Sequence, residues 1–180
     1  CNARVQDVVL SVPSHFHDFQ PQAMLDAANI AGLNCLRLIN EHTATALAYG
    51  IYRTNDFDSE TPTITAFGHM GHSNFSISIA SFTKGRLSIP AERSSSGCAG
   101  RDMDEVLIRH FAAEFEKKHK MDPLENKKAL LKLEDACTKT KKILSANETA
   151  PIGVECLVEE CDLSSKITRE TFEELCKPLK

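Results

Sequence analysis

Hydrophobic and polar residues follow one another in blocks along the first forty positions, and these blocks predict two strands separated by a helix. Residues 7–12 form a short apolar run with β-branched side chains that ends at Pro13, a pattern typical of a buried strand. From Asp18, which can cap a helix, apolar residues recur at helical spacing until Gly32. Residues 35–39 form the second apolar run. The order predicts a βαβ unit with a right-handed crossover.

The next stretch is the most informative part of the chain. A buried strand is expected to lead into a polar turn that carries one acid, Glu41, and then into a helix of small residues that Gly50 stops. An acid at the carboxyl end of a core strand, just before a helix, occupies the place where α/β folds position catalytic and ligand-binding groups. Without further support, the same acid is also compatible with an ordinary solvated side chain.

The periodicity changes after residues 53–62, which are polar and turn-rich and are predicted to form a linker. Residues 75–80 alternate between large apolar side chains and small ones, which indicates a half-buried strand. Together with residues 63–67 and 85–91 this strand predicts a three-stranded meander. Pro90 places the third strand at an edge or a bulge of that sheet.

The second half of the chain predicts three helices and a pair of strands. Apolar residues on one helical face mark a first helix after position 100, and a second helix follows Asp122. Residues 152–158 and 161–163 read as paired strands, and Thr168 caps a last helix. The apolar faces of the first two helices comprise Met103, Val106, Leu107, His110, Phe111 and Phe115, and Leu130, Leu133, Cys137, Thr140 and Leu144.

Composition narrows the class of protein. The net charge is −4, and no basic cluster follows an aromatic run, so we expect no nucleic-acid partner. No apolar run approaches the ~18 residues of a membrane span, and no signal peptide follows Cys1. The first residue is not Met, so we expect the chain to be a piece of a longer protein. The seven widely spaced cysteines predict reduced thiols in a cytoplasmic protein, with a disulfide framework as the second choice.

Several short blocks, in this order, resemble the seventy-kilodalton heat-shock chaperone family, and most of all its larger hundred-and-ten-kilodalton branch. They are residues 30–34 leading into Glu41, Met70-Gly-His-Ser73, Gly100-Arg-Asp-Met-Asp104, Lys141-Lys-Ile-Leu-Ser145-Ala-Asn147 and residues 168–175. The resemblance covers nearly the whole chain and implies an α/β fragment of the actin-like ATPase fold. Residues 1–52 would then end lobe I, residues 63–119 would form the lobe II core, and residues 120–180 its outer subdomain.

The resemblance also implies a site for ATP or ADP with Mg²⁺. In the family, the acid matched by Glu41 helps to position the water that attacks the γ-phosphate, and Pro usually follows it where this chain has His42. The second phosphate hairpin of the family matches residues 67–74, and its adenosine helix matches residues 138–145. The matched cofactor-binding positions are His69, Gly71, His72, Ser73, Asn74, Thr138, Lys141, Lys142 and Ser145.

Several of these positions depart from the pattern of the family's main branch, among them His72 and Ser73 in place of glycines and Asn74 in place of a Thr. His69 stands where the family has an Asp, and an imidazole cannot stabilise Mg²⁺ and its waters as a carboxylate does, so we hypothesise weak or absent hydrolysis. Lys142 lacks the planar guanidinium that can stack on adenine. Thr138 replaces a Glu that accepts from the ribose hydroxyls, and losing one such charged hydrogen bond costs roughly 1.5–3 kcal/mol, or about one to two decades of affinity.

Three functional readings follow from the resemblance. The first is an ATP-binding chaperone domain that assists protein folding or nucleotide exchange with other heat-shock chaperones, co-chaperones and unfolded clients. The second is a degenerate domain that keeps the fold as a protein-interaction scaffold without nucleotide, and the third is an incomplete copy. We also expect the chain alone to lack a closed ATP cleft, because the family's first phosphate hairpin and its adenine loop are not in it.

No metal site is predicted from the pattern of potential ligands. His69 and His72 form an H-x-x-H pair on a predicted hairpin, and Cys98 is a conceivable third zinc ligand. The spacing is nonspecific and no Cys-x-x-Cys pair supports it.

Overall fold

The structure is a computed structural model that describes residues 5–179, so Cys1 lies outside the described residues. Its internal contacts divide the chain into two compact units. The first unit contains the residues up to 69 together with residues 75–95, and the second contains residues 70–74 together with those from 96 onward. The assignment of these residues to the lobes of a larger domain stays a prediction.

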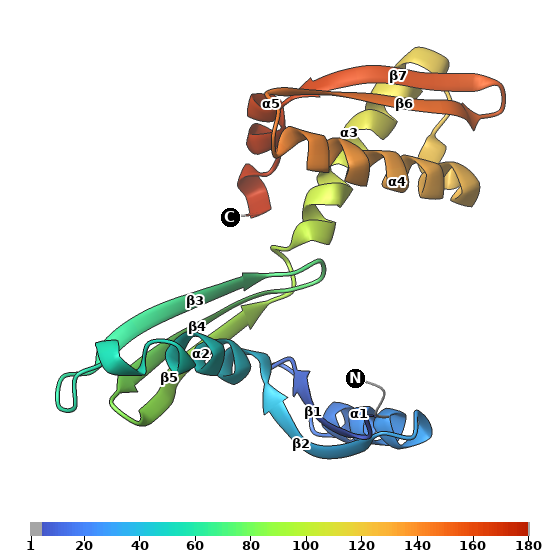
Figure 1. The fold of residues 1–180 in the computed structure, drawn as a ribbon. Helices are drawn as coiled ribbons and strands as arrows, with labels where there is room; N and C mark the ends of the chain where they lie inside the picture. The colour runs from blue at the N-terminus through green and yellow to red at the C-terminus, as the bar shows by residue number, and fades with distance from the viewer. Residues whose placement is uncertain (1–4, 180) are drawn as a thin grey trace. The chain divides into compact units, whose positions relative to one another are not determined.

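The first unit opens with the predicted βαβ motif. Strand β1 (Asp7–Val12) pairs in parallel with β2 (Asn34–Asn40), and helix α1 (Phe19–Ile30) connects them (Figure 1). Gly32 adopts a φ of +73° just after α1 and ends the helix as predicted, because that conformation is costly for other residues. Asp18 stands at the N-cap, but its side chain makes no capping hydrogen bond, so that prediction was wrong.

The two strands are less buried than their apolar runs predict. Val9 on β1 is 56% exposed and Leu36 on β2 is 64% exposed. Among residues 5–179 the sheet has only these two strands, and every second residue of β1, beginning with Asp7, is exposed. An apolar run therefore predicted the strands correctly and their burial incorrectly.

Helix α2 (Glu41–Ile51) begins directly where β2 ends. Asn40 is the N-cap in an extended conformation, and Glu41 is the first helical residue, so no polar turn separates the strand from the helix. The predicted stop at Gly50 was also wrong, because the helix continues to Ile51. Gly50 instead provides a close contact, since a Cβ atom built on it would lie 2.9 Å from the ring of Phe82.

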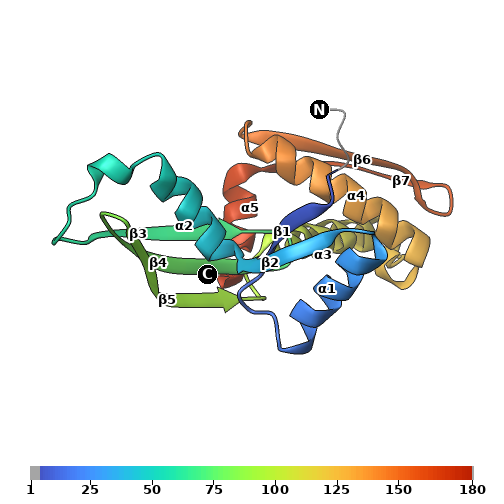
Figure 2. The same cartoon turned by 60° about the horizontal axis from the view of Figure 1, so that its bottom comes forward.

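A three-stranded sheet completes the first unit and confirms the predicted meander. Strands β3 (Thr63–Met70), β4 (Phe75–Thr83) and β5 (Arg86–Ser95) lie in that order, so β5 with Pro90 is at an edge. Helix α2 packs on one face of the sheet (Figure 2). Tyr49 and Phe57 lie within ring-contact distance of Phe82, so the short helix η1 (Thr54–Asp56) and the predicted linker around it pack on this sheet.

The buried face of β4 is the one with small side chains. Ser76, Ser78, Ala80 and Phe82 are buried on this strand, whereas Ile77 is 39% exposed. The alternation thus predicted a half-buried strand correctly, but the large aliphatic residues lie on the more exposed side.

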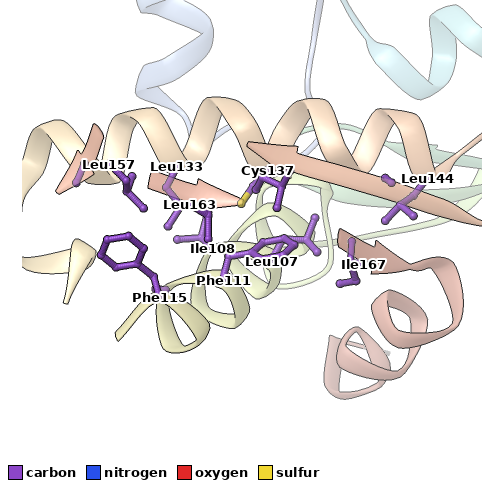
Figure 3. Packing of buried hydrophobic residues seen from close by; sticks show 14 residues of the cluster. Leu107, Ile108, Phe111, Phe115, Leu133, Cys137, Leu144, Leu157, Leu163 and Ile167 are labelled. Carbon is purple, nitrogen blue, oxygen red and sulfur yellow. The ribbon is translucent and has the colours of Figure 1, made fainter. Parts of the chain in front are cut away.

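The second unit surrounds one hydrophobic core. Its elements are α3 (Gly100–His119), η2 (Pro123–Glu125), α4 (Lys127–Leu144), β6 (Thr149–Val158), β7 (Cys161–Thr168), α5 (Arg169–Leu175) and η3 (Lys177–Leu179). The antiparallel β6–β7 hairpin packs against α4, and side chains from both helices and both strands meet between them (Figure 3). The predicted faces are confirmed at Leu107, Phe111 and Phe115 of α3 and at Leu133, Cys137, Thr140 and Leu144 of α4.

The helix caps of this unit were predicted in part. The Thr168 hydroxyl accepts a hydrogen bond from the Thr171 N–H at 3.2 Å, which confirms it as the cap of α5. Asp122 caps only the short helix η2, and Asn126 caps α4 by accepting from the N–H groups of Lys128 and Ala129. Within residues 5–179, no helix combines the length and the apolarity needed to cross a bilayer.

The cysteine prediction agrees with the structure where it can be compared. Cys35, Cys98, Cys137, Cys156 and Cys161 carry unbridged thiols. Burial, with a smaller contribution from the negative charge of Asp104, raises the pKa of the Cys137 thiol to about 12. Cys137 therefore behaves as a small apolar core residue.

We predict that Gly50→Ala destabilises the protein. The new methyl group meets the buried Phe82 ring, which its aromatic neighbours hold in place. Overpacking costs roughly 1–3 kcal/mol, and helix propensity returns about 1 kcal/mol, so we expect a net loss of about 1 kcal/mol in urea unfolding. Gly153→Ala is the control, because a Cβ atom built there would have no other atom within 4 Å. A Gly50→Ala variant as stable as the control would contradict this packing.

We also predict that Cys137 makes stability fall at alkaline pH. The native thiol stays protonated up to about pH 12, while the unfolded thiol ionises near 9.0, so the free energy of unfolding drops as pH rises between these values. The drop amounts to about 1 kcal/mol by pH 10. Urea titrations at pH 8 and pH 10 should show a smaller pH dependence for Cys137→Ala than for the wild type. Equal slopes would be inconsistent with a buried neutral thiol.

Candidate functional site

The loop between β3 and β4, residues 70–74, is held against the first turn of α3. Within the loop, the Gly71 N–H donates to the Asn74 carbonyl oxygen at 2.9 Å. Two further backbone hydrogen bonds leave α3 for the loop: the Gly100 N–H donates to the Gly71 carbonyl at 3.0 Å, and the Arg101 N–H to the His72 carbonyl at 2.7 Å. The loop is thus fixed by main-chain atoms, whatever its side chains are.

The glycine at position 100 lets two backbone segments approach closely at this junction. A Cβ atom there would lie 3.3 Å from the Gly71 carbonyl oxygen and 3.5 Å from the Cα of His72. Both neighbours are backbone atoms, which cannot rotate away as a side chain can. The start of α3 is further fixed by Asp102, whose carboxylate accepts from the Ala99 N–H at 2.8 Å and also favours the positive end of the helix dipole.

The predicted adenosine residues lie on one face of α4. Thr138, Lys141, Lys142 and Ser145 are three, four and seven positions apart, a spacing that aligns side chains along one side of a helix. We refer to these four residues as the α4 stripe. Thr138 and Lys141 are half-buried, whereas Lys142 and Ser145 are exposed.

Lys141, a member of the α4 stripe, contacts the start of α3, which is itself bonded to the loop. Its ammonium Nζ lies 2.8 Å from the Gly100 carbonyl oxygen and 2.8 Å from Oδ1 of Asp104. The contact with Asp104 is an ion pair rather than a well-directed hydrogen bond. Lys141 and the loop therefore share Gly100 as a common neighbour, Lys141 at its carbonyl and Gly71 at its N–H.

The importance of Asp104 was missed in the sequence. Only 3% of Asp104 is exposed, although acids are rarely buried without a partner. The pattern held a usable signal, because Asp104 stands three and four positions before the buried Leu107 and Ile108. An acid on the apolar face of an amphipathic helix requires a cation close by, and Lys141 provides it.

The two remaining predicted residues belong to the first unit. Glu41 is half-buried in the first turn of α2, where its negative charge favours the helix dipole, and His42 after it is buried. His69 is exposed near the end of β3. The other predicted residues, from Gly71 to Ser145, belong to the second unit.

The zinc alternative receives no support. Among residues 5–179 there is no group of three or more His, Cys, Asp or Glu side chains that could hold a metal ion, so His69 and His72 have no third ligand there. Residues 69–74 also contain no carboxylate, so any Mg²⁺ near this loop would need ligands from elsewhere.

The chemistry of the second-unit residues suits a phosphorylated ligand. Lys141 and Lys142 carry ammonium groups, Ser73 provides a hydroxyl group within the fixed loop, and Ser145 provides one at the C-cap of α4. Cations and loop N–H groups bind phosphate oxygens, and hydroxyls serve ribose or phosphate equally. These residues fit a nucleotide better than they fit its metal.

Comparisons with known proteins agree on one family. The family model described as Hsp70 protein matches residues 1–180. Heat shock 70 kDa protein 14 of Arabidopsis thaliana is 48% identical over 99% of this chain and 21% of its own length. Heat shock protein 88 of Dictyostelium discoideum is 47% identical over 97% of this chain and 22% of its own.

A human relative is matched over similar shares of the two chains. Heat shock 70 kDa protein 4L of Homo sapiens is 44% identical over 97% of this chain and 21% of its own length. The chain thus spans about a fifth of the length of the curated relatives it matches.

Proposed function

Because the chain belongs to the Hsp70 family, we propose that it forms part of an ATP-binding domain of a heat-shock-type chaperone. Membership confirms the predicted family and, with it, the fold class, an α/β fragment of the actin-like ATPase fold. What this piece binds, and what the whole protein does, are the subject of the proposal.

In the proposal, the loop of residues 70–74 takes the phosphates and the α4 stripe takes the adenosine. The junction at Gly100 is the observation that supports it most directly, since it holds the loop and Lys141 at a fixed spacing. Bound ATP would contact both parts. Lys142 and Ser145 are exposed on the same helical face and are accessible to the ligand.

The proposed role of the whole protein is ATP-linked assistance to protein folding in the cytoplasm. Its partners would be other heat-shock chaperones, co-chaperones and unfolded clients, with nucleotide exchange as the specific task. That task depends on binding nucleotide more than on hydrolysing it, so it tolerates His69 in place of a carboxylate. The scaffold alternative draws its support from His69, Asn74 and Thr138, and two of these, His69 and Thr138, remove family carboxylates from the site.

We predict that the protein in its natural full-length form binds MgATP at micromolar concentration or tighter. Isothermal titration calorimetry measures this directly. Lys142→Gln should weaken binding about tenfold, because it removes one charge-assisted contact. Lys139→Gln is the matched control on the same helix, where the lysine faces Asp135. If the protein folds cooperatively but the titration with MgATP releases no heat, the proposed function is wrong and the scaffold alternative takes its place.

We further predict that steady-state ATP turnover is at background, because an imidazole at position 69 cannot organise Mg²⁺ as a carboxylate does. His69→Asp should raise turnover at least several-fold with little change in ATP affinity. Adding Glu41→Gln should abolish that gain. Robust turnover in the wild type that Glu41→Gln removes would show the hypothesis of weak hydrolysis to be wrong.

A further inference from the structure

Asp104 is the buried acid that the proposed function does not use. The residue is only 3% exposed, and its ion-pair partner is Lys141, from the neighbouring helix. Burying two charges is expensive, and an apolar pair of similar size is often as stable. Stability alone therefore gives a weak reason for this pair, and its contacts suggest a positioning role.

The contacts of Lys141 lead in two directions. Its ammonium forms an ion pair with the Asp104 carboxylate on α3, with Nζ 2.8 Å from Oδ1, and donates a hydrogen bond to the Gly100 carbonyl at 2.8 Å. An ammonium has three N–H groups, so the bond to Gly100 leaves donors for a ligand. Asp104 and Gly100 together determine where the ammonium lies.

Gly100 is also hydrogen-bonded to the loop. Its N–H donates to the Gly71 carbonyl, and the next N–H, of Arg101, donates to the His72 carbonyl. A Cβ atom on Gly100 would lie 3.6 Å from Lys141 Nζ and 3.3 Å from the Gly71 oxygen, so both neighbours lie close to Gly100. A shift of the Lys141 ammonium would therefore act on the same residue that bonds to the loop.

We propose that Asp104 is a positioning residue, which holds the Lys141 ammonium on Gly100 and thereby fastens the loop of residues 70–74 to the α4 stripe. The structural part of this role concerns the protein without ligand. Its consequence for affinity rests on the proposed function. A ligand that contacts both the loop and the α4 stripe loses less entropy on binding when the spacing between them is already fixed.

Hydrogen exchange tests the structural part in the ligand-free, natural full-length protein. Asp104→Asn keeps the shape of the side chain and removes its charge. We expect the Gly100 and Arg101 amides, which bond to the loop, to exchange at least tenfold faster, while amides in β6 and β7 keep their wild-type rates. Asp135→Asn is the matched control, because Asp135 forms an exposed ion pair with Lys139 and both residues lie on α4. Unchanged rates at Gly100 and Arg101 would overturn the proposal.

A double-mutant cycle separates positioning from ordinary core packing. Lys141→Met should accelerate the same two amides, and the double variant should match Lys141→Met alone, because Asp104 acts through Lys141. Independent, additive effects would overturn the proposal. If Asp104→Asn fails to fold, the comparison of Lys141→Met with the wild type tests the proposal through the exchange rates of the same two amides.

Nucleotide affinity distinguishes this proposal from the one it builds on. If the wild type binds MgATP, Asp104→Asn should weaken binding about tenfold and should add nothing in the Lys141→Met background. Full ATP affinity in Asp104→Asn would overturn the role in binding. If the wild type binds no nucleotide, the proposed function fails, and the exchange rates alone decide whether Asp104 fastens the loop.

Discussion

The close approach of two backbones, at Gly71 and Gly100, is the contact on which the candidate site depends. The loop after β3 has few apolar side chains to bury, so packing alone cannot hold it. Hydrogen bonds at 3.0 Å and 2.7 Å from Gly100 and Arg101 hold it instead, and a Cβ atom at position 100 would lie only 3.3 Å from the Gly71 oxygen. The start of α3 also presents the Gly100 carbonyl to which Lys141 donates.

Periodicity predicted the elements well where one face of an element is strongly apolar. The core faces of α3 and α4 were predicted correctly because Leu107, Phe111, Leu133 and their neighbours are apolar and are buried in one core. On β4 the alternation predicted a half-buried strand but could not show which face α2 would cover. Ala46 and Gly50 bring that helix close to the sheet, and the small face of β4 accepts it.

The site was predicted from resemblance more than from pattern. Local spacing places Thr138, Lys141, Lys142 and Ser145 on one helical side without any comparison, but it assigns them no ligand. Asp104 was missed because acids on helices are usually solvated, and its partner is 37 residues later on another helix. A cation and an anion so far apart in sequence are paired only by the tertiary fold. The polar turn expected to carry Glu41 is absent, because Asn40 allows the strand to enter α2 directly.

Nucleotide binding and hydrolysis would depend on different atoms of this chain. Binding, as proposed, rests on backbone groups of the loop, on Gly100 and on the ammonium of Lys141, all within the second unit. Hydrolysis would depend on Glu41 and on the position of His69, which belong to the first unit. Asp104 cannot replace the missing carboxylate near a metal ion, because its charge already faces Lys141. Under the proposed function, a substitution at position 69 would therefore affect turnover while the hydrogen bonds between the loop and α3 stay in place.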